Sequence, residues 1–165
     1  MEGLGLGYNK GYVIAIGIAL IFVAALLTGY YFLSRVPPEG YSEISLLDAN
    51  GKAADYPDLL LIGQNNSFSI SVNVENHMGK TLHFEVRVKI TDQARPDFPV
   101  AGEAKNVYPF TLENGGKWNT AATTTIDTPG NWMVVYELWA QDEKSGALQF
   151  TGNACVLNVE ATNQT

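Results

Sequence analysis

The chain has 165 residues, and its 10 Lys and Arg against 17 Asp and Glu give a formal net charge of −7 at pH 7. This acidic balance disfavours nucleic acids and anionic lipid surfaces as partners, because both require clustered basic side chains. A single cysteine excludes an internal disulfide framework and a cysteine-rich metal site. The length suits one folded domain with an appendage.

The appendage is an uncharged apolar segment at residues 11–34, which follows a short tail at 1–10. As an α-helix it would be about 36 Å long, enough to cross the roughly 30 Å hydrocarbon core of a bilayer with some tilt. Tyr12 at one end, and Tyr30 and Tyr31 at the other, are spaced like interfacial aromatic belts. We therefore expect a transmembrane helix. A cleaved secretory signal is the alternative, but the length of the segment and its aromatic end favour an uncleaved anchor.

Small residues recur at four-residue spacing along this segment, as Ala15 with Ala19 and Ala25 with Gly29. Such pairs let two membrane helices approach closely, so we predict contact with a partner helix. The alternative is that Ala and Gly are merely common in membrane helices.

Residues 35–40 form a short linker that contains two prolines, and they end the helical pattern. The charges on either side of the helix, Lys10 and Arg35, favour a cytoplasmic N-terminus only slightly. The domain over residues 41–165 would then be extracytoplasmic.

After the linker, apolar and polar residues alternate with period two, which indicates half-buried β-strands. Residues 67–75 and 81–91 give the clearest alternation, and we expect them to pair as a hairpin. The strand expected at 132–140 is apolar on both faces and should be central in its sheet. Shorter strands are expected at 41–47, 107–112, 117–126, 147–151 and 154–160, and a short apolar run lies at 59–62.

Short strands with turn signals at roughly every 8–12 residues predict an immunoglobulin-like antiparallel β-sandwich. A closed barrel is the alternative architecture. The expected fold class is therefore mainly β, with one N-terminal transmembrane helix before the sandwich.

Several short motifs in this region share the spacing of a known family. They are Tyr41-Ser42-Glu43, Asn50-Gly51-Lys52-Ala53, Asp55-Tyr56-Pro57, Asn76-His77, Gly116-Lys117-Trp118, Pro129-Gly130-Asn131-Trp132 and Tyr136-Glu137-Leu138-Trp139. Over about residues 41–159, the chain resembles the archaeal membrane-associated family called domain of unknown function 1616. The resemblance implies an archaeal source, a membrane anchor and an exported β-sandwich, and it carries over no catalytic residue.

The front of the chain offers a rival interpretation. Lys10-Gly11, followed by a long apolar helix and a β-sandwich, resembles archaeal type IV pilin and archaellin precursors. The resemblance implies cleavage after Gly11 and assembly of the helices into a filament.

The sequence gives little support for a copper site. A blue-copper centre needs two His, one Cys and an axial Met, but neither His nor Met follows Cys155. His77 lies in a turn and His83 on the polar face of its strand. Cys155 is better explained as a small core residue in the final strand.

Other chemistry is equally weak. His83 and Glu85 lie two residues apart on one strand face and can touch, but this pattern is typical of a solvated surface. Asp92, Asp97 and Glu103 share one loop and offer oxygen ligands for calcium, although without a recognised spacing. We expect no enzyme activity, no cofactor, no metal and no small-molecule substrate.

Two sequons, at Asn65 and Asn163, offer glycosylation sites if the domain is exported. The sequence therefore predicts a membrane-anchored, extracytoplasmic β-sandwich that acts by binding. Its expected partners are the lipid bilayer and either other subunits of a membrane complex or proteins of the cell envelope.

Overall fold

The computed structural model describes residues 10–34, 40–48 and 51–163. The chain divides into two units, Met1–Glu39 and Gly40–Thr165. The first unit contains the helix α1 (Lys10–Leu33), and the second contains eight strands, β1 to β8.

Helix α1 qualifies as a membrane span by length and composition. Residues Gly11–Leu33 have a mean hydropathy of 2.5, and none of the most apolar stretch is buried against the described chain. Thr28, the only Ser or Thr among residues 11–33, donates its hydroxyl to the Ala24 carbonyl oxygen at 2.7 Å, so this polar group is satisfied within the helix. The membrane-interface positions of Tyr12, Tyr30 and Tyr31 stay predictions.

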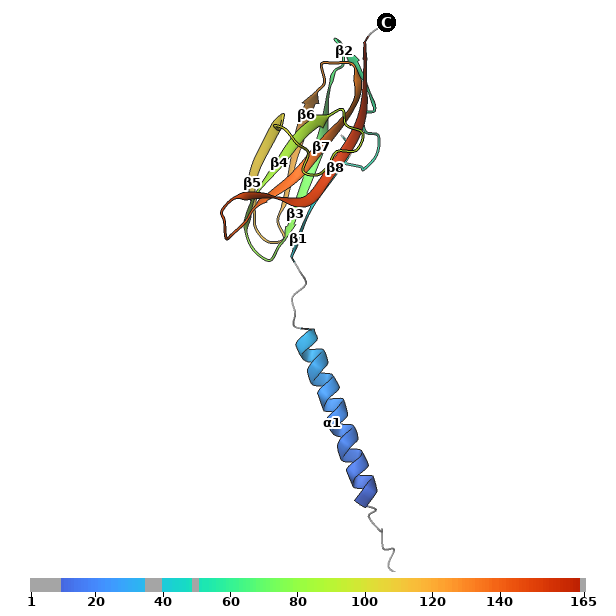
Figure 1. Ribbon diagram of the computed structural model, residues 1–165, viewed down its shortest axis with the longest axis vertical. Coiled ribbons are helices and arrows are strands. Elements are labelled where there is room, and N and C mark those ends of the chain that lie inside the picture. The colour runs from blue at the N-terminus through green and yellow to red at the C-terminus, as the bar shows by residue number, and fades with distance from the viewer. Residues whose placement is uncertain (1–9, 35–39, 49–50, 164–165) are drawn as a thin grey trace, which may run out of the picture. The chain divides into compact units, whose positions relative to one another are not determined.

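The second unit is built from two sheets that pack face to face (Figure 1). The three-stranded sheet has the order β1 (Tyr41–Leu47), β3 (Ser67–His77), β6 (Lys117–Thr125). The five-stranded sheet has the order β2 (Leu59–Ile62), β8 (Leu148–Asn163), β7 (Gly130–Gln141), β4 (Leu82–Thr91), β5 (Asn106–Leu112). This confirms the immunoglobulin-like sandwich and excludes a closed barrel. Neighbouring strands are antiparallel, except that β2 runs parallel to β8.

The predicted hairpin between the two clearest strands is wrong. β3 pairs with β1 and β6, whereas β4 lies in the other sheet between β7 and β5. The link between β3 and β4 therefore crosses from one sheet to the other. Both strands bury one face in the same core, so their alternation is the same as that of two paired strands.

The two C-terminal strands that the sequence predicts are one strand, β8. Its pairing with β7 shifts register opposite Glu137 and Trp139, and Gly152 adopts a left-handed φ of 87° within it. A β-bulge inserts a residue and bends a strand without ending it. The residues around Gly152 thus look like a turn in the sequence but continue the ladder.

Strand β7 is central, as predicted, and it supplies much of the core. Val134, Tyr136 and Leu138 are fully buried, while Trp132 is only partly buried at the edge of the core. The hydroxyls of Tyr136 and Thr124 lie 3.4 Å apart and connect the two sheets.

Candidate functional site

The structure separates the residue pairs on which catalysis or metal binding would depend. His83 contacts the Thr111 hydroxyl at 3.3 Å, whereas Glu85 accepts a hydrogen bond from Arg87 at 2.9 Å, so His83 and Glu85 do not form a pair. Within the described ranges, no group of three His, Cys, Asp or Glu is arranged to hold a metal ion.

That finding includes the three acidic residues of the long loop. Asp92, Asp97 and Glu103 are not brought together as calcium ligands. They lie at exposed positions along the loop, where sharing one segment is not enough to make their side chains converge.

Cys155 lies against β1. Its Sγ donates to the Ile44 carbonyl oxygen at 3.3 Å, and burial raises the pKa of the thiol. A thiol with a raised pKa is a poor nucleophile and a poor metal ligand at neutral pH. This agrees with a packing role.

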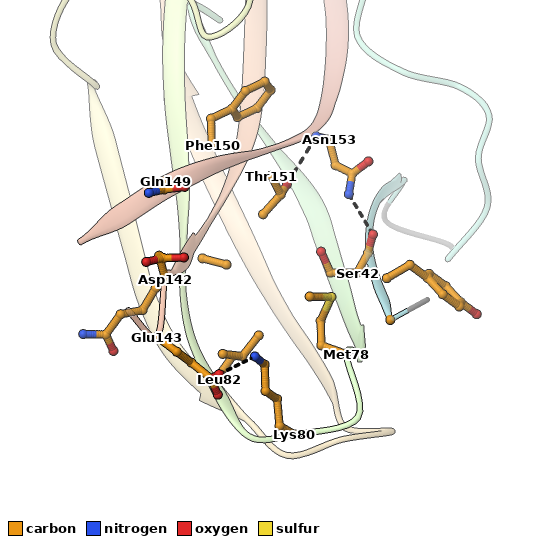
Figure 2. Close-up of a pocket in the computed structure, with 14 residues that line it drawn as sticks. Ser42, Met78, Lys80, Leu82, Asp142, Glu143, Gln149, Phe150, Thr151 and Asn153 are labelled. Atoms are coloured by element: carbon orange, nitrogen blue, oxygen red, sulfur yellow. Dashed lines mark hydrogen bonds and ion pairs between the residues drawn. The ribbon is translucent and has the colours of Figure 1, made fainter. Parts of the chain in front are cut away.

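One end of the sandwich carries a hollow of about 580 Å³, which we call the entry groove. It is lined by the start of β1, by the turn between β3 and β4, and by the adjoining parts of β7 and β8 (Figure 2). The chain enters the sandwich at this end, opposite the C-terminal end of β8 (Figure 1).

The floor of the entry groove is apolar. Met78, Leu82 and Ala140 contribute to it, and Leu82 belongs to the buried core. The ring of Phe150 points away from the groove and packs against Trp139, with ring centroids 5.9 Å apart (Figure 2). An apolar floor with a polar rim is the usual composition of a binding pocket in a protein.

The rim of the entry groove is polar and charged. Lys80 Nζ lies 2.8 Å from Glu143 Oε2, and the two side chains are 41% and 60% exposed (Figure 2). An ion pair this exposed adds little to stability, because water competes for both charges. Asp142 accepts hydrogen bonds from the backbone N–H groups of Lys144 and Ser145, and the bonds from Ser145 are the main reason that the pKa of Asp142 is lowered. The hairpin that carries the rim is therefore held in one shape.

The walls of the entry groove are tied together across long sequence distances. Asn153 Nδ2 donates to the Ser42 carbonyl oxygen at 2.7 Å, which joins β8 to the start of β1 (Figure 2). A Cβ atom on Gly40 would lie 2.7 Å from Met78 Cα, so only glycine fits at this close approach of two backbones.

Similar hydrogen bonds from side chains to backbone carbonyl oxygens continue along the free edge of β1. The carbonyl oxygens of Ser42, Ile44 and Leu46 accept hydrogen bonds from Asn153, Cys155 and the Tyr56 hydroxyl, the last at 2.7 Å. Side chains thereby occupy the acceptors that an added strand would need. The entry groove consequently suits an inserted side chain better than strand pairing.

A second hollow, of about 670 Å³, lies on the outer face of the five-stranded sheet. Beneath its rim lies a buried ion pair, in which Lys89 Nζ is 3.2 Å from Glu137 Oε2 and both side chains are at most 9% exposed. The Val100 backbone donates to Glu137 and accepts from Lys89, and Trp139 Nε1 donates to Glu137 at 3.1 Å. All these partners are intramolecular, so the pair fastens the loop between β4 and β5 to the sheet.

Sequence reasoning missed this ion pair. In the alternation over residues 81–91, Lys89 falls on the polar face, where an exposed lysine is ordinary. The available signal was Glu137, an acidic residue inside a strand that is apolar on both faces.

The residues predicted for helix packing and glycosylation are accessible. Ala15, Ala19 and Ala25 are exposed, and Gly29 has no atom within 4 Å of its ideal Cβ position outside its own helix and neighbours. Asn65 is exposed in the turn after β2, and Asn163 is exposed at the end of β8. The rest of the Asn163 sequon, residues 164–165, lies outside the described residues.

Comparison with known proteins identifies a family and a fold. Residues 36–156 match the model of the family described as Domain of unknown function (DUF1616). A search of curated proteins finds no match. The CARDB domain of the PF1109 protein from Pyrococcus furiosus, solved in complex with di-metal ions, is 13% identical with a TM-score of 0.50, over 76% of this chain and 96% of that one.

A β-glucosidase from Listeria innocua is 14% identical with a TM-score of 0.49. The match covers 76% of this chain but only 16% of the enzyme. At these identities, the likeness to the CARDB domain shows the fold alone.

Proposed function

The chain belongs to the DUF1616 family, and from that premise we propose that it is a non-catalytic, extracytoplasmic β-sandwich, anchored in the membrane as an accessory subunit of a larger complex. The coarser description, a β domain behind a membrane-anchoring helix, fits the family match and the apolar helix α1. The family is described as a domain of unknown function, and the likeness to the CARDB domain supports a β-sandwich fold.

The observation that carries the accessory role is the surface of α1. None of its most apolar stretch is buried within the described chain, so the helix is free to pack on other membrane helices. Ala15, Ala19, Ala25 and Gly29 fall near one face, because the interval from Ala15 to Gly29 is close to four turns at 3.6 residues per turn. Small side chains on one face let a second helix approach and gain dispersion contacts along its length.

The test is co-purification from native membranes in mild detergent. We expect wild-type protein to bring down a defined membrane partner, and the double variant Ala19→Leu with Gly29→Leu to stay in the membrane but recover much less of it. A plain anchor would tolerate both substitutions, because leucine is as apolar as lipid.

The chain offers a matched control. Gly17 and Ala24 lie about 180–200° around the helix from Ala15, so Gly17→Leu with Ala24→Leu makes the same pair of changes on the opposite face. If both double variants recovered as much partner as wild-type protein does, α1 would serve only as a membrane anchor. Mature protein that starts after Gly11 and copurifies as a filament would favour the pilin-like alternative.

A further inference from the structure

We propose that the entry groove docks an extramembrane loop of the same partner, one that inserts an apolar side chain next to a Lys or Arg. This inference rests on the proposed accessory role and names the second contact through which that role is exerted.

The shape and floor of the groove fit an inserted side chain. Its volume of about 580 Å³ lies within the range of binding pockets in proteins. Met78 is only partly buried there, and methionine adapts its shape to different apolar partners. Backbone pairing is not the mode of contact, because the edge acceptors of β1 next to the groove are already taken.

The charges at the rim favour a basic neighbour. Asp142 and Glu143 line the groove with Lys80, in a chain whose net charge is −7, and Lys144 lies close to Asp142. The Lys80–Glu143 pair is exposed on both sides, so Glu143 can exchange its partner at little cost. A Lys or Arg beside the inserted side chain would pair with Glu143 and guide the encounter of two oppositely charged surfaces.

The place of the groove in the chain points to the partner of α1. Gly40 and Tyr41, the first residues of the sandwich unit, line it, and along the sequence residues 34–39 connect them to the end of α1. The length of this connection limits how far the groove can lie from a partner that binds α1.

Photo-crosslinking of the full-length protein in native membranes tests the inference. A benzophenone amino acid replaces Gln149, an exposed residue at the groove, or, as a control, Ser69, which is exposed on the outer face of the three-stranded sheet. We expect the Gln149 probe to capture the membrane partner that co-purifies with wild-type protein, and the Ser69 probe to capture much less.

Charge reversal gives a second readout. Glu143→Lys should lower the yield of the Gln149 adduct at least about fivefold, because like charges then meet across the contact. Glu160→Lys, an exposed site on β8 away from the groove, makes the same change in net charge and should leave the yield unchanged.

The failures of the two proposals are distinguishable. A partner that co-purifies through α1 but is not captured by the Gln149 probe would overturn the groove contact and leave the accessory role intact. Equal capture by both probes, or an adduct with a second copy of this chain, would also overturn it. A Gln149 adduct that persists in the Ala19→Leu and Gly29→Leu variant would support the groove as a contact that is independent of the helix.

Discussion

Glu137→Gln replaces only one carboxylate oxygen by an amide nitrogen, but it should strongly destabilise this protein. The variant keeps the shape of the side chain and an oxygen acceptor for the Val100 N–H group. It removes the negative charge that faces Lys89, whose side chain is only 9% exposed. The ammonium group is then buried without a counter-charge.

The expected cost follows from that burial. Removing one member of a buried ion pair typically costs about 3–5 kcal/mol, whereas replacing both members with apolar side chains of similar size is often close to neutral. Glu137→Leu and Lys89→Met should each be costly alone, and the two combined in one protein should cost far less than the sum of these single variants. The difference measures the coupling between the two charges.

The assay is urea unfolding of the full-length protein in detergent, followed by tryptophan fluorescence. With a slope of about 1–3 kcal/mol per molar urea, the single variants should lower the midpoint by at least about 1 M. Glu143→Gln breaks an exposed pair at the entry groove and serves as the control, with little change expected. A midpoint shift for Glu137→Gln as small as that of the control, or additive single variants, would refute the role of the buried pair.

Three further outcomes are expected. Burial raises the pKa of Tyr136 to about 12, so the stability that its protonated form contributes is complete below pH 10 and is lost as the pH rises from 10 to 12. Between pH 10 and 12, the urea midpoint should therefore fall less steeply for Tyr136→Phe than for wild-type protein. An equally steep fall in both proteins would contradict this. Asn76→Ala should cost about 2–4 kcal/mol in the same unfolding assay, because the buried Asn76 amide donates to the carbonyl oxygens of Lys80, Leu112 and Glu113 and joins two loops. If Asn76→Ala lowered the stability no more than Asn114→Ala, a change at an exposed asparagine, these hydrogen bonds would not be important for stability. Protease added to intact cells should degrade the sandwich, and protection until lysis would reverse the proposed topology.

The helix and most strand positions follow from local patterns. An apolar run of the right length predicts α1, and alternation predicts β1 and β4 to within a residue or so, because burial of one strand face imposes a period of two on the sequence. The family resemblance also depends on buried residues, such as Asn76 and Tyr136.

Strand partners and the candidate site depended on contacts between distant residues. Alternation shows that β3 and β4 each bury one face, but it cannot show that they do so from opposite sheets, since either arrangement fills the same core. The entry groove combines Ser42 with Asn153, which are 111 residues apart, and the buried pair combines Lys89 with Glu137 under Val100. A periodic pattern reports only whether a side chain is buried, whereas its partner is decided by the three-dimensional packing of the sheets and loops.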